Sequence, residues 1–460
     1  MTMPLASLSE DWTFAQVSRA ETLWGPHGYH RYPAKFIPQL VHGLIASYSV
    51  CGNLIGDPFV GSGTTGVEAL RLGRHFWGGD VNEVALLMSR AKCTPLDPAT
   101  LEAFWRYLSN LLERVPRAER RYLTADERAA ITIIDVAHAS RAERFAYWFP
   151  TPHRTSLEHI LQAILTLRDE SCRTLFLCGF SNILKRCSIW LSGSTKVQKD
   201  LNKLLVDPVD EFRRQCRDML KRNTLYWNCL LADGVEPWAL PQKWDIQQYD
   251  ARHLPMLDAT FDLLVTSPPY ATCYEYKEIH QLTQLWFERY KLVHTYDTQE
   301  CWIGSKALSH RTQNQDGMAC DAFTTSTGSS IADGALADLA QLGVGSITQS
   351  VRHEVRALRH YFQDMSLALA EFARVIIPGK YVILIIGDSY RRGIPIPTSQ
   401  AMCEMAQNVG LELERRIVRQ IPNRVLVSTR DKATGRFSAV AQSDVQVYPE
   451  EDILIFKRLL

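Results

Sequence analysis

The pattern of apolar and polar positions divides the chain into a sheet-forming part and a helix-rich part. Short apolar runs, each ending in an acid or a turn, cover Asn53–Asp57, His75–Asp80, Trp244–Tyr249 and Phe261–Thr266. A continuous apolar run at Tyr381–Ile386 is typical of a strand at the centre of a sheet. A helical pattern at Thr65–Leu72 links the first two runs into a β-α-β unit. An α/β fold with a doubly wound, mostly parallel sheet is therefore expected.

Between about 97 and 236 the periodicity becomes helical, as at Leu101–Val115 and Asp210–Leu220, which predicts a mostly helical insertion. Residues 310–350 are rich in Gly, Ser, Thr, Ala and Asp, and we expect a mobile surface segment there. A long helical pattern at Val355–Val375 is then broken by Pro378-Gly379. The run Asp452–Phe456 predicts a last strand.

Composition narrows the class of protein only modestly. With 460 residues, 46% hydrophobic and 22% charged, the chain can bury a large core. The 51 Lys and Arg against 50 Asp and Glu give a net charge of +1, so charge alone does not argue for nucleic-acid binding. The 11 cysteines contain no CxxC pair, which favours reduced thiols in a cytoplasmic protein without a zinc site. No apolar run is long enough to span a membrane.

A glycine-rich turn follows the first predicted strand and reads Asp57-Pro58-Phe59-Val60-Gly61-Ser62-Gly63-Thr64-Thr65-Gly66. The spacing matches a dinucleotide-binding loop, but a carboxylate at Asp57 would repel a pyrophosphate. A cationic ligand fits better, because the methionine end of S-adenosylmethionine carries an ammonium with which Asp57 could pair. The glycines allow close approach of the backbone, and the helix start at Thr64 and Thr65 could receive the ligand carboxylate. A plain tight turn is the alternative.

Two more acids end predicted strands. Asp80 is placed to accept hydrogen bonds from ribose hydroxyls. Asp250 could meet the adenine amino group, although a surface acid or a helix cap explains it equally well.

The segment Thr266-Ser267-Pro268-Pro269-Tyr270 follows another predicted strand. Two prolines make a rigid exit, whose carbonyls are free to point into the crevice at the carboxyl end of the sheet. An exocyclic amino group conjugated to a ring is a poor nucleophile. Acceptors such as the Ser267 hydroxyl and the Pro268 carbonyl could aim its lone pair at a methyl group, and Tyr270 offers a face for an extruded base. Taken alone, the pentapeptide also fits a loop with a core tyrosine.

Together, the glycine-rich turn and the Ser-Pro-Pro-Tyr segment resemble the DNA amino-methyltransferase family. Its members transfer a methyl group from S-adenosylmethionine to N4 of cytosine or N6 of adenine. The Ser-Pro-Pro-Tyr form is similar to cytosine-N4-specific members, whereas adenine-N6 members more often carry Asp or Asn before Pro-Pro-Tyr. Tyr32-Pro33-Ala34-Lys35-Phe36 resembles the upstream segment that closes over the methionine moiety. The resemblance implies a Rossmann-like class I core, double-stranded DNA as substrate, a flipped-out target base and no metal.

The motifs and the resemblance together predict the site residues. Those expected to hold the cofactor are Lys35, Asp57, Phe59, Gly61, Gly63, Thr64, Thr65, Asp80 and Asp250. Those expected to hold the base are Ser267, Pro268, Pro269 and Tyr270.

Two segments are candidates for DNA contact. Around Phe180–Lys196, basic, hydroxyl and aromatic groups alternate, and the candidate phosphate contacts are Lys185, Arg186, Ser188 and Lys196. The alternative is a solvated helix end with Trp190 in the core. The second segment, Trp302–Arg311, includes Lys306 and could line the target-base pocket, or it is an ordinary flexible loop.

We therefore expect a methyltransferase core built from residues 21–96 (cofactor-binding part), 237–290 (catalytic loop) and 355–460 (C-terminal strands). A mostly helical insertion at 97–236 and a flexible insertion at 291–354 are both candidates for DNA recognition. Rival interpretations are an adenine-N6 enzyme, an RNA amino-methyltransferase, a catalytically dead nucleic-acid-binding module and a dinucleotide oxidoreductase. A cognate restriction nuclease is a conceivable partner, and the sequence leaves the oligomeric state open.

Overall fold

The structure is a computed structural model of the chain. It describes residues 12–32, 35–136, 138–194, 197–271, 276–293, 302–304, 326–342, 349–421 and 450–460, and the statements below concern these residues.

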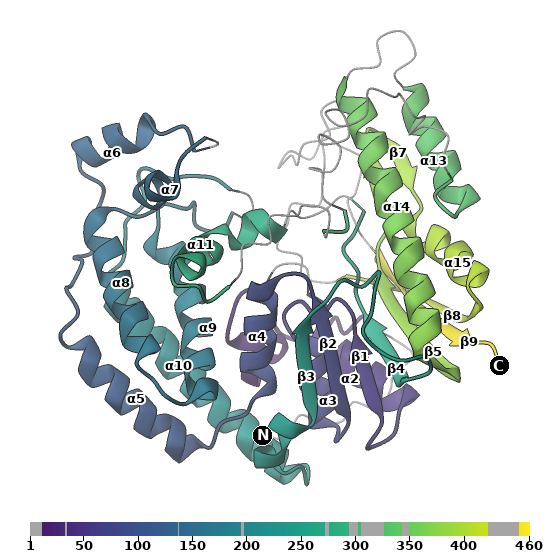
Figure 1. Cartoon of the computed structure of the whole chain (residues 1–460), viewed down its shortest axis with the longest axis horizontal. Coiled ribbons are helices and arrows are strands. Elements are labelled where there is room, and N and C mark those ends of the chain that lie inside the picture. The colour runs from purple at the N-terminus through teal and green to yellow at the C-terminus, as the bar shows by residue number, and fades with distance from the viewer. Residues whose placement is uncertain are drawn as a thin grey trace.

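A seven-stranded sheet forms the centre of the molecule (Figure 1). Its strands, in spatial order, are β3 (Trp244–Gln248), β2 (His75–Asp80), β1 (Leu54–Asp57), β4 (Phe261–Thr266), β5 (Ile376–Ile386), β9 (Glu450–Arg458) and β8 (Leu411–Gln420). Strand β9 runs in the opposite direction to the other six strands of the sheet. The expected mixed, mostly parallel sheet is confirmed. The strand order reverses between β1 and β4, which is where open α/β sheets bind ligands.

Alternate side chains of the central strands enter two separate cores. In β5, Ile383 and Ile385 pack with the helices on one face, whereas Val382 and Leu384 pack with those on the other. The first face is covered by α2 (Pro38–Tyr48) and α3 (Thr64–Arg71), and the second by α13 (Ser330–Gln341), α14 (Gln349–Val375) and α15 (Thr398–Asn408). Helix α4 (Glu83–Cys93) packs against α3 and β3. Burial on both faces explains why the strands read as continuous apolar runs.

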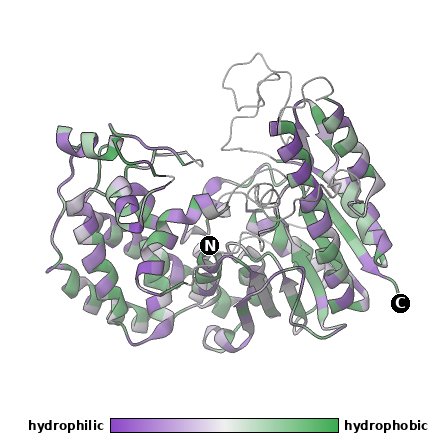
Figure 2. Cartoon of the chain, turned by 45° about the horizontal axis from the view of Figure 1, so that its top comes forward, coloured by the Kyte–Doolittle hydropathy of each residue, from purple (hydrophilic) through white to green (hydrophobic). Residues whose placement is uncertain are grey.

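A helical lobe stands beside the sheet on the left of Figure 1. It consists of α5 (Pro98–Leu112), α6 (Ala125–Thr132), α7 (Arg141–Trp148), α8 (Thr151–Leu165), α9 (Glu170–Cys187) and α10 (Pro208–Ala232). These helices share one apolar core with α11 (Tyr276–Arg289), which follows the Ser-Pro-Pro-Tyr segment in the chain. Figure 2 shows the helices alternating between hydrophobic and hydrophilic positions, as expected for elements with one buried side.

The short elements are α1 (Arg19–Thr22), η1 (Gly25–Gly28), η2 (Pro237–Gln242) and a hairpin of β6 (Ser389–Arg391) with β7 (Ile394–Ile396). Local side chains fix many helix starts. Asp97 caps α5 and Asp207 caps α10, each followed by a proline at the first helical position. Thr124 with Glu127 and Ser140 with Glu143 form capping boxes at the starts of α6 and α7.

The structure differs from the sequence expectations in two places. Strand β5 begins at Ile376 and runs through Pro378-Gly379, where a register irregularity and a positive φ of 80° at Gly379 accommodate the proline. The segment expected to be a flexible insertion contains α13, and α14 begins at Gln349 instead of Val355. Helix α13 forms because Ala332, Ala335, Leu336 and Leu339 repeat at helical spacing and pack on α14.

Within the described ranges, we find no helix with both the length and the apolar character needed to cross a bilayer.

Trp286 should be the main anchor of α11 on the helical lobe. Its ring is buried and lies edge-on to Phe145, Phe149 and Phe180, with centroid distances of 4.9, 5.6 and 5.7 Å. We expect Trp286→Ala to lower stability by about 3–5 kcal/mol, because it leaves a large cavity among these rings. The exposed Trp238 is the matched control, and its replacement by alanine should cost less than about 0.5 kcal/mol. Denaturant unfolding measures both, and equal effects would show that Trp286 is not an anchor.

Candidate functional site

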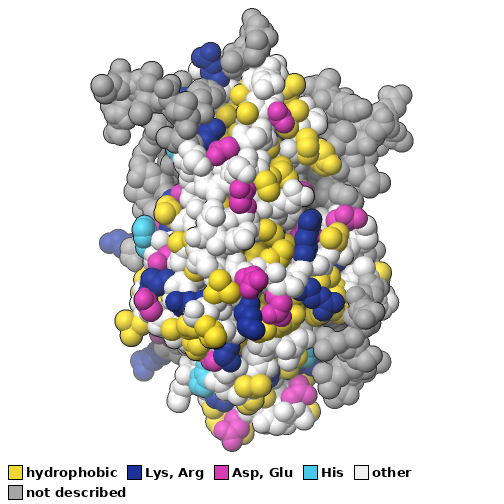
Figure 3. All heavy atoms as spheres, turned by 90° about the vertical axis from the view of Figure 1, so that its right-hand side faces the viewer, with side chains coloured by type: hydrophobic (Ala, Val, Ile, Leu, Met, Phe, Trp, Pro, Cys, Tyr) yellow, Lys and Arg dark blue, Asp and Glu magenta, His cyan; other side chains and the backbone are white. Residues whose placement is uncertain are grey.

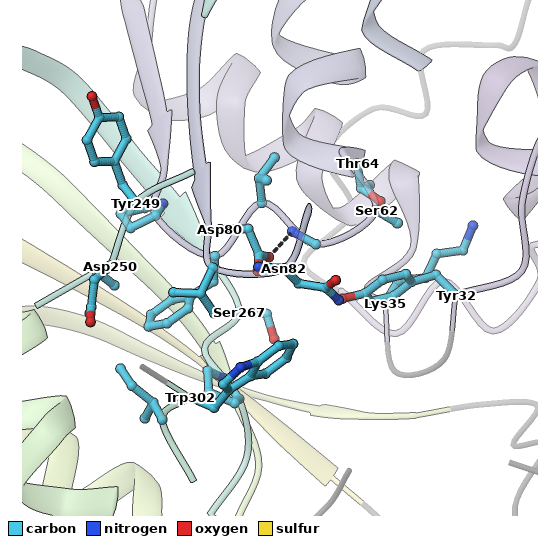
Figure 4. A pocket seen from close by; sticks show the side chains of 18 of the residues that line it. Tyr32, Lys35, Ser62, Thr64, Asp80, Asn82, Tyr249, Asp250, Ser267 and Trp302 are labelled. Atoms are coloured by element: carbon cyan, nitrogen blue, oxygen red, sulfur yellow. Dashed lines mark hydrogen bonds between the residues drawn. The ribbon is translucent and has the colours of Figure 1, made fainter. Parts of the chain in front are cut away.

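A pocket opens at the carboxyl ends of the parallel strands, beside the point where the strand order reverses. It encloses about 820 Å³, open mouth included. Its walls come from the segment before α2, the glycine-rich turn after β1, the ends of β2 and β3, the segment after β4, and Trp302 with Ile303. Figure 4 shows Asp80 near the middle of the pocket. Tyr249 and Asp250 lie toward one end, and Lys35, Ser62 and Thr64 lie toward the other.

Asp57 joins the glycine-rich turn to the Ser-Pro-Pro-Tyr segment. Its buried carboxylate accepts hydrogen bonds from the hydroxyls of Thr65 at 2.7 Å and Thr266 at 2.6 Å, and from the amide of Phe59 at 3.1 Å. Burial raises the pKa of Asp57 to about 6, while these hydrogen bonds act in the opposite direction. The side chain does not line the pocket. Asp57 therefore sets the relative position of the two motifs, which differs from the expected contact with a ligand ammonium.

The backbone of the glycine-rich turn is held from behind by α4 and from the side by β2. Ser89 donates to the carbonyl of Gly61 at 2.9 Å, and Lys92 donates to that of Ser62 at 2.8 Å. The Gly61 amide donates to Asp80 at 2.9 Å. Gly63 has a φ of 79°, and a Cβ there would come within 2.8 Å of the Ser89 backbone, so only glycine fits. The turn is thus fixed before any ligand arrives.

Of the two strand-end acids, Asp80 is the more central. It also accepts from the Asn82 amide at 2.9 Å, and burial raises its pKa to about 6. Asp250 lines the pocket but is paired with Arg252 at 2.6 Å, and Arg252 pairs in turn with Asp364 of α14 at 2.7 Å. The pairing fixes the direction of the Asp250 carboxylate.

At the opposite end of the pocket lie the buried hydroxyls of Ser62 and Thr64. Ser62 Oγ and Thr64 Oγ1 line the pocket and have no hydrogen-bond partner within the described part of the chain. They stand at the amino end of α3, whose cap residue Gly63 supplies no side-chain acceptor to its first amides. Free hydroxyls and helix amides together suit a carboxylate. Lys35 also lines this end, and its ammonium donates to the His27 carbonyl at 2.9 Å.

The segment after β4 contributes Ser267 and Pro269 to the pocket wall, and Trp302 lies beside Ser267 in Figure 4. Pro268 and Tyr270 do not line the pocket. The Tyr270 hydroxyl donates to Glu451 of β9 at 3.1 Å, and its ring lies against Gly387. Tyr270 therefore braces the segment against the neighbouring strands.

Comparison with known proteins shows similarity to DNA methyltransferases. The sequence profile of the N6/N4 methyltransferases, described as DNA methylase, matches residues 6–90, which contain the glycine-rich turn. A type II methyltransferase, M.MvaI of Kocuria varians, is 25% identical over 438 residues, covering 91% of this chain and 89% of that protein. The type II methyltransferase M.MjaII of Methanocaldococcus jannaschii is 37% identical over 90 residues, covering 20% of this chain and 17% of that protein. The chain is thus similar to DNA amino-methyltransferases, through the profile at its amino-terminal part and through a type II methyltransferase over most of its length.

Solved structures that resemble this methyltransferase do so distantly. A putative DNA modification methylase of Thermus thermophilus is 14% identical with a TM-score of 0.21, covering 46% of this chain and 52% of that one. The rRNA methyltransferase aviRa of Streptomyces viridochromogenes is 11% identical with a TM-score of 0.33, covering 97% and 96%. Likenesses this distant carry no functional argument.

The cofactor of this methyltransferase is S-adenosylmethionine, and the pocket fits it. The partnerless hydroxyls and the amino end of α3 suit the carboxylate of its methionine part. Asp80 suits the ribose in the middle, and the end with Tyr249 and Asp250 remains for adenine. Of the nine residues predicted to hold the cofactor, those that line the pocket are Lys35, Phe59, Gly61, Thr64, Asp80 and Asp250, while Asp57, Gly63 and Thr65 lie behind it.

Several pocket residues were not among the predicted site residues, notably Tyr32, Ser62, Asn82 and Tyr249. Tyr32 and Ser62 lie inside motifs that were identified, and Asn82 and Tyr249 lie within two residues of Asp80 and Asp250, so the motifs and their neighbours carried the signal. Asn82 caps α4 and also donates to His280 of α11 at 2.8 Å, a contact between segments 198 positions apart.

Most of the residues proposed for DNA contact are engaged within the protein. Lys185 donates to the Ser194 carbonyl, Arg186 pairs with Glu211 at 2.9 Å, and Ser188 is fully buried. Trp190 lies in the core, as the alternative interpretation expected. Burial and these contacts leave Ser188 unable to reach a phosphate in this conformation. Lys196 and Lys306 lie outside the described residues.

The surface seen in Figure 3 carries no large patch of a single charge sign over the described residues. On the side viewed in Figure 3, basic, acidic and apolar side chains are interspersed over the described surface. Elsewhere in the described residues, basic side chains pair with neighbouring acids, as Arg416 does with Asp452 at 2.9 Å. No group of three or more His, Cys, Asp or Glu within the described ranges could hold a metal ion.

We predict that Asp57→Ala weakens binding of S-adenosylhomocysteine, the product form of the cofactor, by at least ~10-fold. The change strands two buried hydroxyls and one amide, each costing about 1–3 kcal/mol, so the turn loses its position. Asp262→Ala is the matched control, because Asp262 accepts from the Leu54 amide at the far ends of the same two strands. It should lower thermal stability but spare affinity by calorimetry. Equal affinity losses in the two variants would contradict the role of Asp57.

We also predict that affinity for S-adenosylhomocysteine falls as the pH drops below about 6. Asp80 has a raised pKa of about 6, and its protonated form offers ribose hydroxyls a poorer acceptor. Binding measured between pH 5 and 8 should decline toward the acid side by up to about tenfold per pH unit. In Asp80→Asn the binding should be weaker, and most of this pH dependence should vanish. An unchanged profile in that variant would assign the titration to Asp57 instead.

Proposed function

We propose that this S-adenosylmethionine-dependent DNA methyltransferase transfers the methyl group to the exocyclic N4 of cytosine in a flipped-out base. The observation that carries the proposal is the presence of Ser267, from the Ser-Pro-Pro-Tyr segment, in the same pocket wall as the cofactor residues. The Ser form of this segment resembles cytosine-N4-specific members of the family. Adenine N6 is the second candidate, since the same frame of acceptors could hold either amine.

In the proposed reaction, the chain supplies geometry rather than covalent chemistry. The Ser267 hydroxyl accepts a hydrogen bond from the target amine, and this directs the nitrogen lone pair at the methyl group. Orientation of this kind supplies much of the rate when two groups are held in line. Trp302, beside Ser267, offers an aromatic face for the extruded base, whereas Tyr270 does not line the pocket.

We further propose that methylation is site-specific and belongs to a restriction–modification pair with a cognate nuclease. Support comes from the type II methyltransferase of Kocuria varians, which matches this chain over 91% of its length. The helical lobe and the segment after α11 are the proposed regions of target recognition.

The direct test of the target base is chemical. DNA incubated with the protein and S-adenosylmethionine is digested to nucleosides and analysed by mass spectrometry. The proposal expects N4-methylcytosine in DNA and none in RNA. N6-methyladenine would assign the second candidate, and methylation of RNA alone would refute the DNA assignment. Long-read sequencing of the same DNA would give the recognition sequence.

We predict that Ser267→Ala slows methyl transfer by about 10²–10³-fold, the scale for loss of one well-placed polar group in an active site. Affinity for S-adenosylhomocysteine should stay within about twofold, because Ser62 and Thr64 hold the opposite end of the cofactor. Single-turnover assays and calorimetry measure the two quantities.

Tyr270→Phe is the control for this experiment. It removes only the hydroxyl bonded to Glu451 and should change the rate by less than about fivefold, the effect of one partly exposed hydrogen bond. Equal slowing in Ser267→Ala and Tyr270→Phe would remove the special role of Ser267.

A further inference from the structure

Helix α4 places a buried ammonium group directly behind the glycine-rich turn. Lys92 is fully buried, and its ammonium donates to the Ser62 carbonyl at 2.8 Å. Ser89, three residues earlier on the same helix, donates to the neighbouring Gly61 carbonyl. The two side chains thus hold two successive carbonyls of the turn on the side away from the pocket. Ser89 achieves this without a charge, so holding the turn does not require the ammonium.

No negative charge within the described residues balances Lys92. Neither Lys92 nor Lys35 forms an ion pair with a described carboxylate, and the two ammonium groups repel each other. The other titratable groups that act on Lys92 or respond to it are the thiols of Cys93 and Cys178 and the imidazoles of His27 and His30. Burial raises the pKa of both thiols and lowers that of both imidazoles, so none is charged at neutral pH.

The nearby acid on α3 has other partners. Glu68 accepts from His27 at 2.7 Å and from His42 at 2.8 Å, and Arg71 lies 3.7 Å away. Burial lowers the pKa of Lys92 to about 8, which still leaves it mostly protonated at pH 7. An unbalanced buried cation opposes folding, so its retention calls for an anion that is absent from the ligand-free chain.

The position of Lys92 identifies that anion. The residue whose carbonyl it binds, Ser62, faces the pocket at the end where the two partnerless hydroxyls and the amino end of α3 meet (Figure 4). We propose that Lys92 is a positioning residue for the cofactor, whose charge acts through the Ser62 peptide to hold the carboxylate of the methionine moiety. The inference rests on the S-adenosylmethionine assignment and adds to it a charge from outside the pocket lining.

Two ligands distinguish an effect of the Lys92 charge from an effect of the shape of the turn. S-adenosylhomocysteine carries the carboxylate, whereas 5′-methylthioadenosine keeps the adenosine and sulfur but lacks the amino-acid end. Calorimetry with the full chain compares wild type with Lys92→Met, which removes charge and donor, and Lys92→Gln, which removes the charge and keeps a donor on a side chain one atom shorter. Both variants should bind S-adenosylhomocysteine at least ~10-fold more weakly, the scale for loss of one charge a few ångströms from its counter-ion. Affinity for 5′-methylthioadenosine should change less than about twofold.

Ser89→Ala is the matched control, because it removes the other support of the turn and alters no charge. Its effect, if any, should be the same for the two ligands. The ligand-free Lys92 variants should unfold within about 3 °C of wild type, since they lose an unbalanced charge. If either variant fails to fold, the other carries the binding test.

Three results would overturn the inference. The first two are an equal loss of affinity for both ligands and no loss of affinity for either. The third is failure of both Lys92 variants to fold, which would show that the charge of Lys92 serves folding. A wild-type chain that binds neither ligand would instead overturn the cofactor site itself.

Discussion

The carboxylate of Asp57 is the contact on which the active site depends. It ends β1, and it binds one hydroxyl from the glycine-rich turn and another from the end of β4. Strands β1 and β4 are adjacent and parallel, and the strand order reverses between them. A bridge between Thr65 and Thr266 fixes how far the methyl donor lies from Ser267. The bridge lies in the core, where low exposure makes each hydrogen bond costly to break.

Around this bridge, the pocket sorts its chemistry by position. The glycine-rich turn faces one end, where the hydroxyls of Ser62 and Thr64 lie near ammonium groups. Asp80 stands in the middle, and Asp250, which is paired with Arg252, stands at the other end. The pocket wall comes from six separate segments of chain. Such an arrangement orients an elongated ligand that is anionic at one end and offers hydrogen-bond donors along its length. In the proposed complex the central reacting atom faces the Ser267 wall, which lies beside Trp302 from the later insertion.

The sequence alone predicted the parallel part of the sheet, because strands buried on both faces carry apolar runs that end at an acid or a turn. It predicted the pocket residues that sit directly at those strand ends, such as Asp80 and Ser267. The antiparallel pair β8 and β9 was only half predicted, since β8 is charged and mostly exposed and so lacks an apolar run. The sequence also did not predict the direction of side chains. Asp57 stands in a motif where a ligand contact is expected, yet its carboxylate points into the protein.

The candidate DNA contacts illustrate the same limit. Lys185 and Ser188 lie at a helix end, where a sequence pattern cannot distinguish a solvated basic surface from a packed corner. In the structure Lys203, from a later segment, donates to the carbonyls of both and of Trp190, which closes the corner. Contacts between residues far apart in sequence decide such cases, and a single sequence does not contain them.

The most direct measurement of the central claim is a crystal structure with S-adenosylhomocysteine and cytosine-containing DNA bound. The account predicts that Asp57 keeps both threonine partners, that the amino-acid end lies at Ser62 and Thr64, and that the sulfur faces an extruded base held at Ser267. A structure in which Asp57 leaves Thr65 and Thr266 to contact the cofactor, or in which the sulfur lies remote from Ser267, would contradict it.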